Sequence, residues 1–437
     1  RESYYTKELE LRLSTSYGPG RYDSDYEDKG HDYPYGYVRW TENRNMEAFL
    51  QLVGQGRIDT QPLISHRYSI EQADSAYKMM LDNTEPYLGI LLSYPGDAAS
   101  APLRRVEMRE QKPAEGVNLG IIGAGNHVKD MLLPKLKQLN EVQLRAICTG
   151  TGANAKGLAE KVGAAYCTSD YQQVLGDETV NAVLIGTRHN SHGSMVLDAI
   201  NAGKHVFVEK PLCLTEQELE AITEAYADGN CTLLVGFNRR FSPHADRARE
   251  FFADRKDPLV MTYRVNAGSI PADHWIQDPE SGGGRIIGEA CHFIDYMQAV
   301  CGAPPVSVSG QRIAAHSSGI LDDQSVMLFG FADGSVGTVI YAAGGSTALS
   351  KERFEAFGGG KSLVMDDFML TEFYDGHTRS TFKTRKRDKG FQAEMTAFTD
   401  AVTTGSAAAM PFDEIAAVTR ASILAAMSLR TGESYDV

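Results

Sequence analysis

The segment Lys204–Pro211, KHVFVEKP, carries the main signal for the fold class of this chain. A helix-stopping Gly203 precedes it, and three apolar β-forming residues, 206–208, then run into charge and proline. This pattern is typical of a short buried strand. Ligands of open α/β sheets bind at the carboxyl ends of the strands, so Lys210 is the first candidate active-site residue. An isolated Glu-Lys-Pro is more often a solvent-exposed loop, and the upstream sequence decides against that alternative.

The upstream segments alternate apolar strands with capped helices. Thr215 with Glu218, for example, has the spacing of a capping box. Such alternation specifies a parallel sheet with both faces covered. We therefore predict an α/β fold with a doubly wound Rossmann domain, which binds a dinucleotide, over residues 117–240. Its predicted strands are 119–122, 143–147, 182–186, 206–208 and 232–237.

A glycine pair, Gly123 and Gly125, lies where the first of these strands passes into a helix. Such a pair allows a tight turn and brings the backbone close to a pyrophosphate, whose charge the helix N-terminus favours. Val128 stands where the fingerprint has its third small residue, so the motif gains specificity only from its place between strand and helix. A plain turn is the alternative. Pro134 should kink or delay the helix.

The strand 143–147 ends in CTGTG, without the acidic residue that binds the ribose of NAD. Its absence removes a repulsion against the 2′-phosphate of NADP, which Thr149, Thr151 and Lys156 could contact. We expect NAD or NADP, and the pattern slightly favours NADP. The candidate cofactor-binding residues are Gly123, Gly125, Asn126, His127, Thr149, Thr187, His192, Glu209 and Lys210.

Beyond residue 258, the alternation of strands and helices ends, and the sequence predicts strands joined by short turns. Few helix-sized segments divide these strands, so we predict an α+β domain over residues 241–437 with a largely antiparallel open sheet. Two late helices, 391–402 and 412–429, should return to the dinucleotide domain. An exposed apolar sheet would favour a homo-oligomer. The predicted strands are 260–265, 306–313, 325–331, 335–342 and 353–357.

A second chemical stretch opens this domain: HWIQDPESGGGRIIGEACHFIDYM, His274–Met297. Glu289 and His292 lie three apart on a predicted helix and share a face. An imidazole titrates near neutral pH, which suits a catalytic base. A helix histidine beside a glycine run is nevertheless often structural, and Glu289 could equally cap the helix or form an ion pair. Weaker candidates for substrate contacts are Arg240, Arg285 and Trp275.

Four motifs together resemble the glucose-fructose oxidoreductase, inositol dehydrogenase and rhizopine catabolism (Gfo/Idh/MocA) family. They are GIIGAGN, TRHNSH, AGKHVFVEKPL and VGFNRRFSP, in the family's order and spacing, and the likeness runs from about residue 117 to the C-terminus. It implies that Lys210 is catalytic and that His292 acts as base on a substrate hydroxyl. Family members commonly have an aspartate where this chain has Gly288, so a third catalytic role for Glu289 stays open.

The resemblance implies an NAD(P)-dependent oxidoreductase with a carbohydrate-type small-molecule substrate. The expected reaction interconverts a secondary alcohol and a ketone of a sugar, sugar nucleotide or cyclitol, with Lys210, His292 and Glu289 as the candidate catalytic residues. Two alternatives stay open. One is an NAD-dependent glycosidase of the same fold, which oxidises its substrate only transiently, and the other is a dinucleotide-sensing protein without chemistry.

Residues 1–96 form a first unit. The segments NMEAFLQLVGQGRID and PLISHRYSIEQADSAYKMM resemble the closing stretch of zinc-type medium-chain alcohol dehydrogenases. This unit has no cysteine and only two histidines, His31 and His66, so we predict a docking remnant and no metal site. Because the chain begins at Arg1, we expect a fragment, and a fused pair of dehydrogenases is one alternative. Residues 97–116 mix alanine, proline and charge, which predicts a linker.

The composition excludes several classes of partner. A net charge of −14 argues against nucleic acid and anionic membranes. No apolar run reaches the length of about 18 residues that a membrane-spanning helix needs. The six cysteines are singly spaced, which indicates reduced thiols and a cytoplasmic protein.

Overall fold

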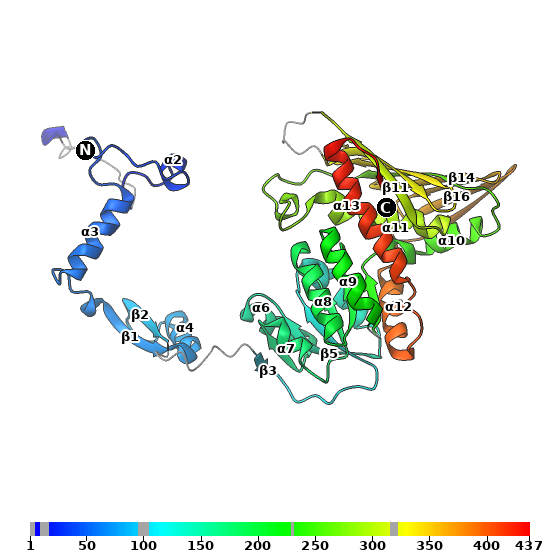
Figure 1. The fold of residues 1–437 in the computed structure, drawn as a ribbon. Helices are drawn as coiled ribbons and strands as arrows, with labels where there is room; N and C mark the ends of the chain where they lie inside the picture. The colour runs from blue at the N-terminus through cyan, green and yellow to red at the C-terminus, as the bar shows by residue number, and fades with distance from the viewer. Residues whose placement is uncertain (1–4, 9–16, 95–104, 229–230, 315–321) are drawn as a thin grey trace. The chain divides into compact units, whose positions relative to one another are not determined.

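The computed structural model describes residues 5–8, 17–94, 105–228, 231–314 and 322–437. The chain divides into two compact units, residues 1–102 and 103–437 (Figure 1).

The first unit is built around two parallel strands joined by a helix. These strands, β1 (Ile64–Ser69) and β2 (Gly89–Ser93), pair in parallel, and α4 (Ala73–Asp82) connects them along the chain. Ser69 and Gln72 form a capping box at the short helix η2 (Ile70–Gln72). No residue of α3 (Glu42–Gly54) is buried. This unit also contains α2 (Ser24–Glu27) and η1 (Gln61–Leu63).

A seven-stranded sheet organises the first half of the second unit, in the order β3-β6-β5-β4-β7-β8-β9. All pairs are parallel except β3 with β6. Every residue of β4 is buried, as expected for a strand covered on both faces. The predicted Rossmann sheet is thus confirmed. Its strands are β3 (Arg105–Glu107), β4 (Val117–Ile122), β5 (Val142–Cys148), β6 (Tyr166–Thr168), β7 (Ala182–Ile185), β8 (His205–Val208) and β9 (Leu233–Val235).

The helices of this half follow the strands, and the first of them is irregular. The segment after the glycine turn begins as the π-helix η3 (Val128–Leu132) and becomes α-helical only at α5 (Leu133–Leu136), in whose first turn Pro134 lies. This agrees with the predicted kink or delay. The other helices are α6 (Gly152–Val162), α7 (Tyr171–Leu175), η4 (His189–Ser191), α8 (His192–Asn201) and α9 (Glu216–Asp228).

The predicted linker, residues 97–116, is partly wrong. Residues 95–104 lie outside the described part of the chain, but β3 pairs antiparallel with β6 and forms the edge of the sheet. Arg105 lies over the ring of the buried Tyr166, with its guanidinium carbon 3.5 Å from the ring centroid. A three-residue edge strand with two charged residues gives too short and too polar a pattern to identify from sequence.

A nine-stranded sheet forms the second half, in the order β17-β16-β15-β14-β10-β13-β12-β11-β18. Only β10 and β13 pair in parallel, so the largely antiparallel sheet is confirmed. The strands are β10 (Val260–Asn266), β11 (Pro305–Arg312), β12 (Gln324–Phe331), β13 (Val336–Ala342), β14 (Glu352–Gly358), β15 (Lys361–Asp366), β16 (Leu370–Asp375), β17 (Thr378–Lys383) and β18 (Tyr435–Asp436).

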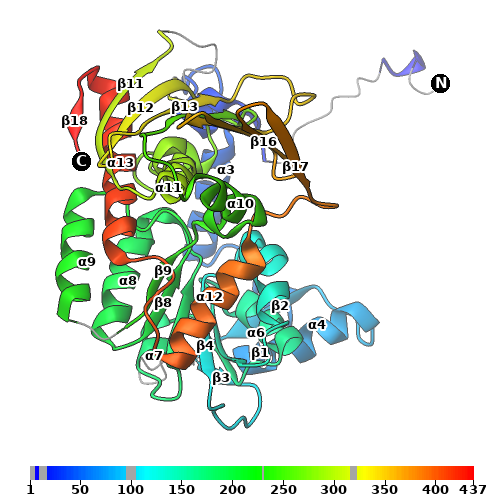
Figure 2. The same cartoon turned by 90° about the vertical axis from the view of Figure 1, so that its right-hand side faces the viewer.

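Helices cover one face of this sheet and tie it to the Rossmann half. The helix α11 packs on β10 and β13, and α12 contacts η3, α5 and β4 (Figure 2). The last long helix, α13, contacts β11 as well as α9 and β9. Both late helices thus contact the Rossmann half. The helices are η5 (Asn238–Phe241), α10 (Pro243–Phe252), η6 (Trp275–Gln277), η7 (Ile286–Ala290), α11 (Cys291–Cys301), α12 (Phe391–Thr404) and α13 (Phe412–Thr431).

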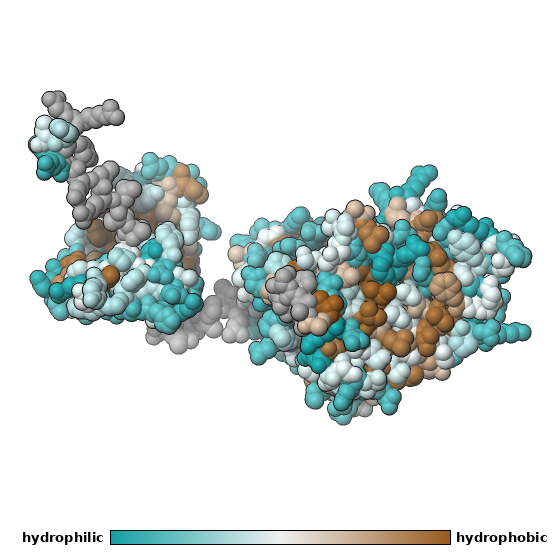
Figure 3. Space-filling view, turned by 90° about the horizontal axis from the view of Figure 1, so that it is seen from above, coloured by the Kyte–Doolittle hydropathy of each residue, from teal (hydrophilic) through white to brown (hydrophobic). Residues whose placement is uncertain are grey.

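Apolar side chains remain exposed on the strands of this sheet. Figure 3 shows apolar side chains among polar ones on one face of this unit. The homo-oligomer that would cover such a surface stays a prediction. Among the described helices, none is long and apolar enough to cross a bilayer. The exposed apolar residues include Val306, Val326, Leu328, Val336 and Phe357.

Candidate active site

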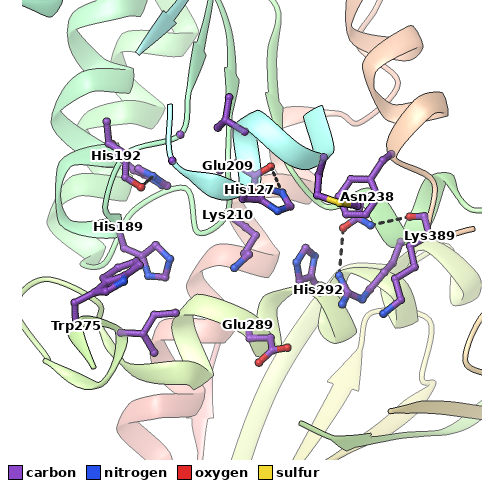
Figure 4. Close-up of a pocket in the computed structure, with 18 of the residues that line it drawn as sticks. His127, His189, His192, Glu209, Lys210, Asn238, Trp275, Glu289, His292 and Lys389 are labelled. Carbon is purple, nitrogen blue, oxygen red and sulfur yellow. Dashed lines mark hydrogen bonds and ion pairs between the residues drawn. The ribbon is translucent and has the colours of Figure 1, made fainter. Parts of the chain in front are cut away.

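A cavity of about 630 Å³ lies between the two halves of the second unit, beside the carboxyl ends of β7 and β8 (Figure 4). The Rossmann half contributes Gly125, His127, Val128, Met131, Gly186, Thr187, His189, His192, Glu209 and Lys210 to its lining. The remaining lining residues are Asn238, Arg239, Trp275, Ile276, Glu289, His292, Lys351, Arg387, Lys389 and Phe391.

The glycine turn after β4 leaves the backbone bare. Gly123 has a φ of +85°, and a Cβ there would lie 2.7 Å from the backbone of Gly186. Gly125 is exposed, and a Cβ at that position would have no heavy atom within 4 Å. A bare backbone at a helix start is what a pyrophosphate needs, so the turn fits the predicted dinucleotide.

Gly186 explains how the turn accommodates Val128. The third glycine of the usual fingerprint allows a helix to pack closely on a strand. Here the small residue is on the partner side, because a Cβ on Gly186 would lie 2.4 Å from a methyl group of Val128. The close approach of the helix to the end of β7 thus depends on Gly186 and not on a third glycine at position 128.

We predict that Gly125→Ala weakens the binding of NADH about tenfold or more, because the new methyl group would occupy space that the pyrophosphate of the dinucleotide needs. Fluorescence titration of NADH would measure the dissociation constant. Gly157→Ala is the matched control, since Gly157 on α6 also has open space at its Cβ position and does not line the cavity. Equal binding by both variants would contradict the assignment of this turn.

Two predicted cofactor-binding residues, His192 and Glu209, lie at the carboxyl ends of the strands, and His192 links the segments that follow β7 and β8. His192 is buried, with Nδ1 donating to the carbonyl of Pro211 at 2.7 Å and Nε2 lying 3.3 Å from the carbonyl oxygen of Thr187. Burial lowers the pKa of His192. Burial also raises the pKa of Glu209, but His127, 3.2 Å away, and Lys210 outweigh it and leave this pKa lowered. Glu209 is therefore ionised at neutral pH.

Lys210 and His292 lie together in the centre of the cavity lining (Figure 4). The Nζ of Lys210 donates to the carbonyl of Gly288 at 2.8 Å. His292 is buried, and its Nδ1 has no hydrogen-bond partner among the described residues. Burial, and then the charges of Arg239 and Lys210, lower the pKa of His292 well below its usual range. Its imidazole is therefore neutral near pH 7.

Glu289 lines the same cavity but is fully engaged by other side chains. Its carboxylate accepts hydrogen bonds from Lys351 at 2.8 Å, from Arg285 at 3.1 Å and from the hydroxyl of Tyr341. Burial raises its pKa, but Lys351 and Arg285 outweigh burial and bring the pKa to about 2. This geometry favours the ion-pair interpretation of Glu289 over a proton-carrying role.

Other predicted residues lie elsewhere. The prediction that Arg240 contacts the substrate is wrong, because its buried guanidinium binds Asp295 and Glu414 and does not line the cavity. Arg285 lies behind the site, on Glu289 and Asp323, so it is also wrong as a substrate contact. Trp275 does line the cavity, edge-on to His189. Asn126 is exposed, Thr149 is half-buried, and neither lines the cavity; their cofactor contacts stay predictions.

Sequence reasoning missed several cavity residues. Lys351, Arg387 and Lys389 lie in the loops before β14 and before α12, and no motif marks those loops. Asn238 and Arg239 are within the quoted VGFNRRFSP motif, yet no role was predicted for them. His189 is within TRHNSH, and its Nδ1 donates to the carbonyl of Gly282 at 2.7 Å.

Comparison with known families gives two matches. The model described as "Oxidoreductase family, NAD-binding Rossmann fold" matches residues 117–237. The model described as "GFO/IDH/MocA C-terminal domain" matches residues 257–364. Neither match extends into residues 1–96, so the likeness of that unit to alcohol dehydrogenases has no support here and stays a prediction.

Two curated relatives are dehydrogenases. The D-xylose 1-dehydrogenase (NADP(+)) 2 of Haloferax volcanii is 30% identical over 188 residues, which span 42% of this chain and 57% of the relative. The scyllo-inositol 2-dehydrogenase (NAD(+)) of Bacillus subtilis is 28% identical over 219 residues, 49% of this chain and 61% of the relative. The chain thus spans about three fifths of the length of these two relatives.

A solved structure shares the fold. Levoglucosan dehydrogenase in complex with NADH and levoglucosan matches with a TM-score of 0.65 at 21% identity, over 74% of this chain and 99% of that one.

Proposed function

The chain belongs, through residues 117–237 and 257–364, to the Gfo/Idh/MocA family of NAD(P)-dependent oxidoreductases, and from this we propose that it interconverts a secondary alcohol and a ketone of a sugar, sugar nucleotide or cyclitol. The observation that carries the proposal is one cavity in which Lys210 and His292 meet beside the bare turn at Gly125. The names of the two curated relatives, dehydrogenases of xylose and scyllo-inositol, support the substrate class.

NAD or NADP, when bound, supplies the redox chemistry by exchanging a hydride with the carbinol carbon. The turn at Gly123 and Gly125 would hold its pyrophosphate. Oxidation of the alcohol removes two electrons and two protons. The hydride carries both electrons and one of the protons, so the protein must accept the other proton, from the hydroxyl. His292 is the candidate acceptor, and because its Nδ1 is buried, the proton would go to Nε2.

Lys210 has the complementary role. Its hydrogen bond to the carbonyl of Gly288 fixes the ammonium group and leaves other N–H donors for the substrate. An ammonium beside the reacting oxygen stabilises the negative charge that develops as the proton leaves. Glu289, ionised and held by Lys351 and Arg285, would act on the electrostatics of the site rather than carry a proton.

The test offers a panel of sugars, sugar nucleotides, uronic acids and inositols to the purified protein, with NAD and NADP separately, and follows the absorbance of the reduced nicotinamide. We expect turnover with at least one substrate. Release of free sugar from a glycoside without net nicotinamide turnover would identify the glycosidase instead. Dinucleotide binding without any turnover across the panel would favour the sensing protein.

A further inference from the structure

Positive charge gathers in the half of the cavity that faces the C-terminal sheet. Among the described lining residues, five are lysine or arginine and only two are carboxylates. The cations are Lys210, Arg239, Lys351, Arg387 and Lys389, and the carboxylates are Glu209 and Glu289.

Most of these cations have one carboxylate each. Lys351 pairs with Glu289, and Arg387 pairs with Asp367. Behind the lining, Arg285 pairs with both Glu289 and Asp323. Lys210 lies next in sequence to the ionised Glu209. These groups are close to electrically balanced.

Arg239 and Lys389 are the exception, because both form ion pairs with the same carboxylate, Glu352. This carboxylate, behind the cavity wall, accepts two hydrogen bonds from Arg239, at 2.9 and 3.0 Å. It also accepts from the hydroxyl of Tyr263, at 2.7 Å, and from Lys389. Arg239 and Lys389 thus share this one carboxylate as their hydrogen-bonded counter-charge. Lys389 lines the cavity with only part of its charge offset.

These cations act on the candidate base. After burial itself, the groups that lower the pKa of His292 are Arg239, Lys210, Lys389 and His127. A base works best when its pKa lies near the operating pH. A negative charge on the substrate would offset these cations and make it easier for His292 to take up the proton.

The surroundings show where that charge would sit. In Figure 4, Lys389 and Trp275 lie on opposite sides of Lys210 and His292, and all four line the cavity. Arg387 and Lys351 line both this cavity and an adjoining one of about 300 Å³. Their side chains are 54% and 37% exposed, so they retain N–H groups for a ligand.

We propose that the substrate is an anionic monosaccharide, a sugar acid or a sugar phosphate, whose charged group is bound by Lys389 and Arg387 while its reacting hydroxyl lies at Lys210 and His292. The inference rests on the proposed dehydrogenase function and narrows its substrate. It separates this chain from the two relatives named above, since xylose and scyllo-inositol are uncharged.

Binding, rather than turnover, provides the test. The complex of the protein with NADH is titrated with D-glucuronate, D-glucose 6-phosphate and D-glucose, and the nicotinamide fluorescence gives each dissociation constant. We expect one anionic probe to bind about tenfold or more tightly than glucose, because glucose lacks the charged group that would hydrogen-bond to the cations. Preference for glucuronate would identify a sugar acid, and preference for glucose 6-phosphate a sugar phosphate.

Arg387→Gln should reduce the ratio of anionic to neutral binding about tenfold, and Lys389→Met at least as much. Arg379→Gln is the matched control, because Arg379 also forms an ion pair, with Glu372, but lies outside the cavity lining. The control should leave the ratio unchanged.

Two results would overturn the inference. One is equal or tighter binding of glucose, and the other is an unchanged ratio in both variants. Either can occur while NAD(P)-dependent oxidation of a neutral sugar persists, in which case the dehydrogenase function stands. Failure of the function itself would instead appear as the absence of nicotinamide turnover with every substrate, charged or neutral.

Discussion

Replacing Lys210 with methionine is expected to lower kcat/KM by about 10²- to 10³-fold, the usual cost of removing a donor to a developing oxyanion. Methionine keeps the length and apolar stem of lysine but loses the ammonium, which here donates to the carbonyl of Gly288. The loss should appear in kcat as well as in kcat/KM, because the charge on the substrate oxygen develops in the transition state.

The measurement is steady-state kinetics with the best substrate of the panel, together with titration of NADH. Lys137→Met, at an exposed position of the Rossmann half, is the control for loss of a positive charge. We expect both variants to bind NADH. A Lys210→Met enzyme with undiminished kcat would remove Lys210 from the mechanism and favour a purely structural role at the end of β8.

The strands of the Rossmann sheet were predictable because burial on both faces leaves a plain apolar run. The run VFV of β8 is fully buried, and each of β4, β5 and β7 has a similar run. In the second sheet, β15 and β16 have one buried face, so buried and half-exposed residues alternate. Their sequences, KSLVMD and LTEFYD, include acids and serine, and we predicted no strand there.

The two central residues of the site were predictable because each lies in a recognisable motif. The cationic wall was not, because it depends on contacts between distant residues. Arg240 and Arg239 are neighbours in one motif, yet Arg240 pairs with Asp295 away from the cavity while Arg239 reaches Glu352 behind the cavity wall. Only the packing of α11 and β14 around η5 separates their roles.

His292→Asn is expected to lower kcat/KM by about 10²- to 10⁴-fold, the range typical for loss of a general base. Asparagine is polar and close in size to the imidazole, but it cannot accept the hydroxyl proton. The burial of His292 against Phe237 makes loss of stability the alternative cause of lower activity. Urea denaturation should therefore accompany the kinetics, and NADH binding should persist. Full activity in this variant would exclude His292 as the base.

The pH dependence of the wild type gives a second check on His292. The base works in its neutral form, and in the free enzyme burial and then Arg239 and Lys210 lower its pKa well below the usual 6.5. The imidazole thus stays neutral as the pH falls through 6.5, and kcat/KM, which reports the free enzyme, should show no decline there. An anionic substrate would offset the neighbouring cations and raise this pKa in the complex. The acid limb of kcat should then lie at higher pH than that of kcat/KM, whereas a kcat/KM limb centred near 6.5 would mean that His292 titrates as an ordinary exposed imidazole.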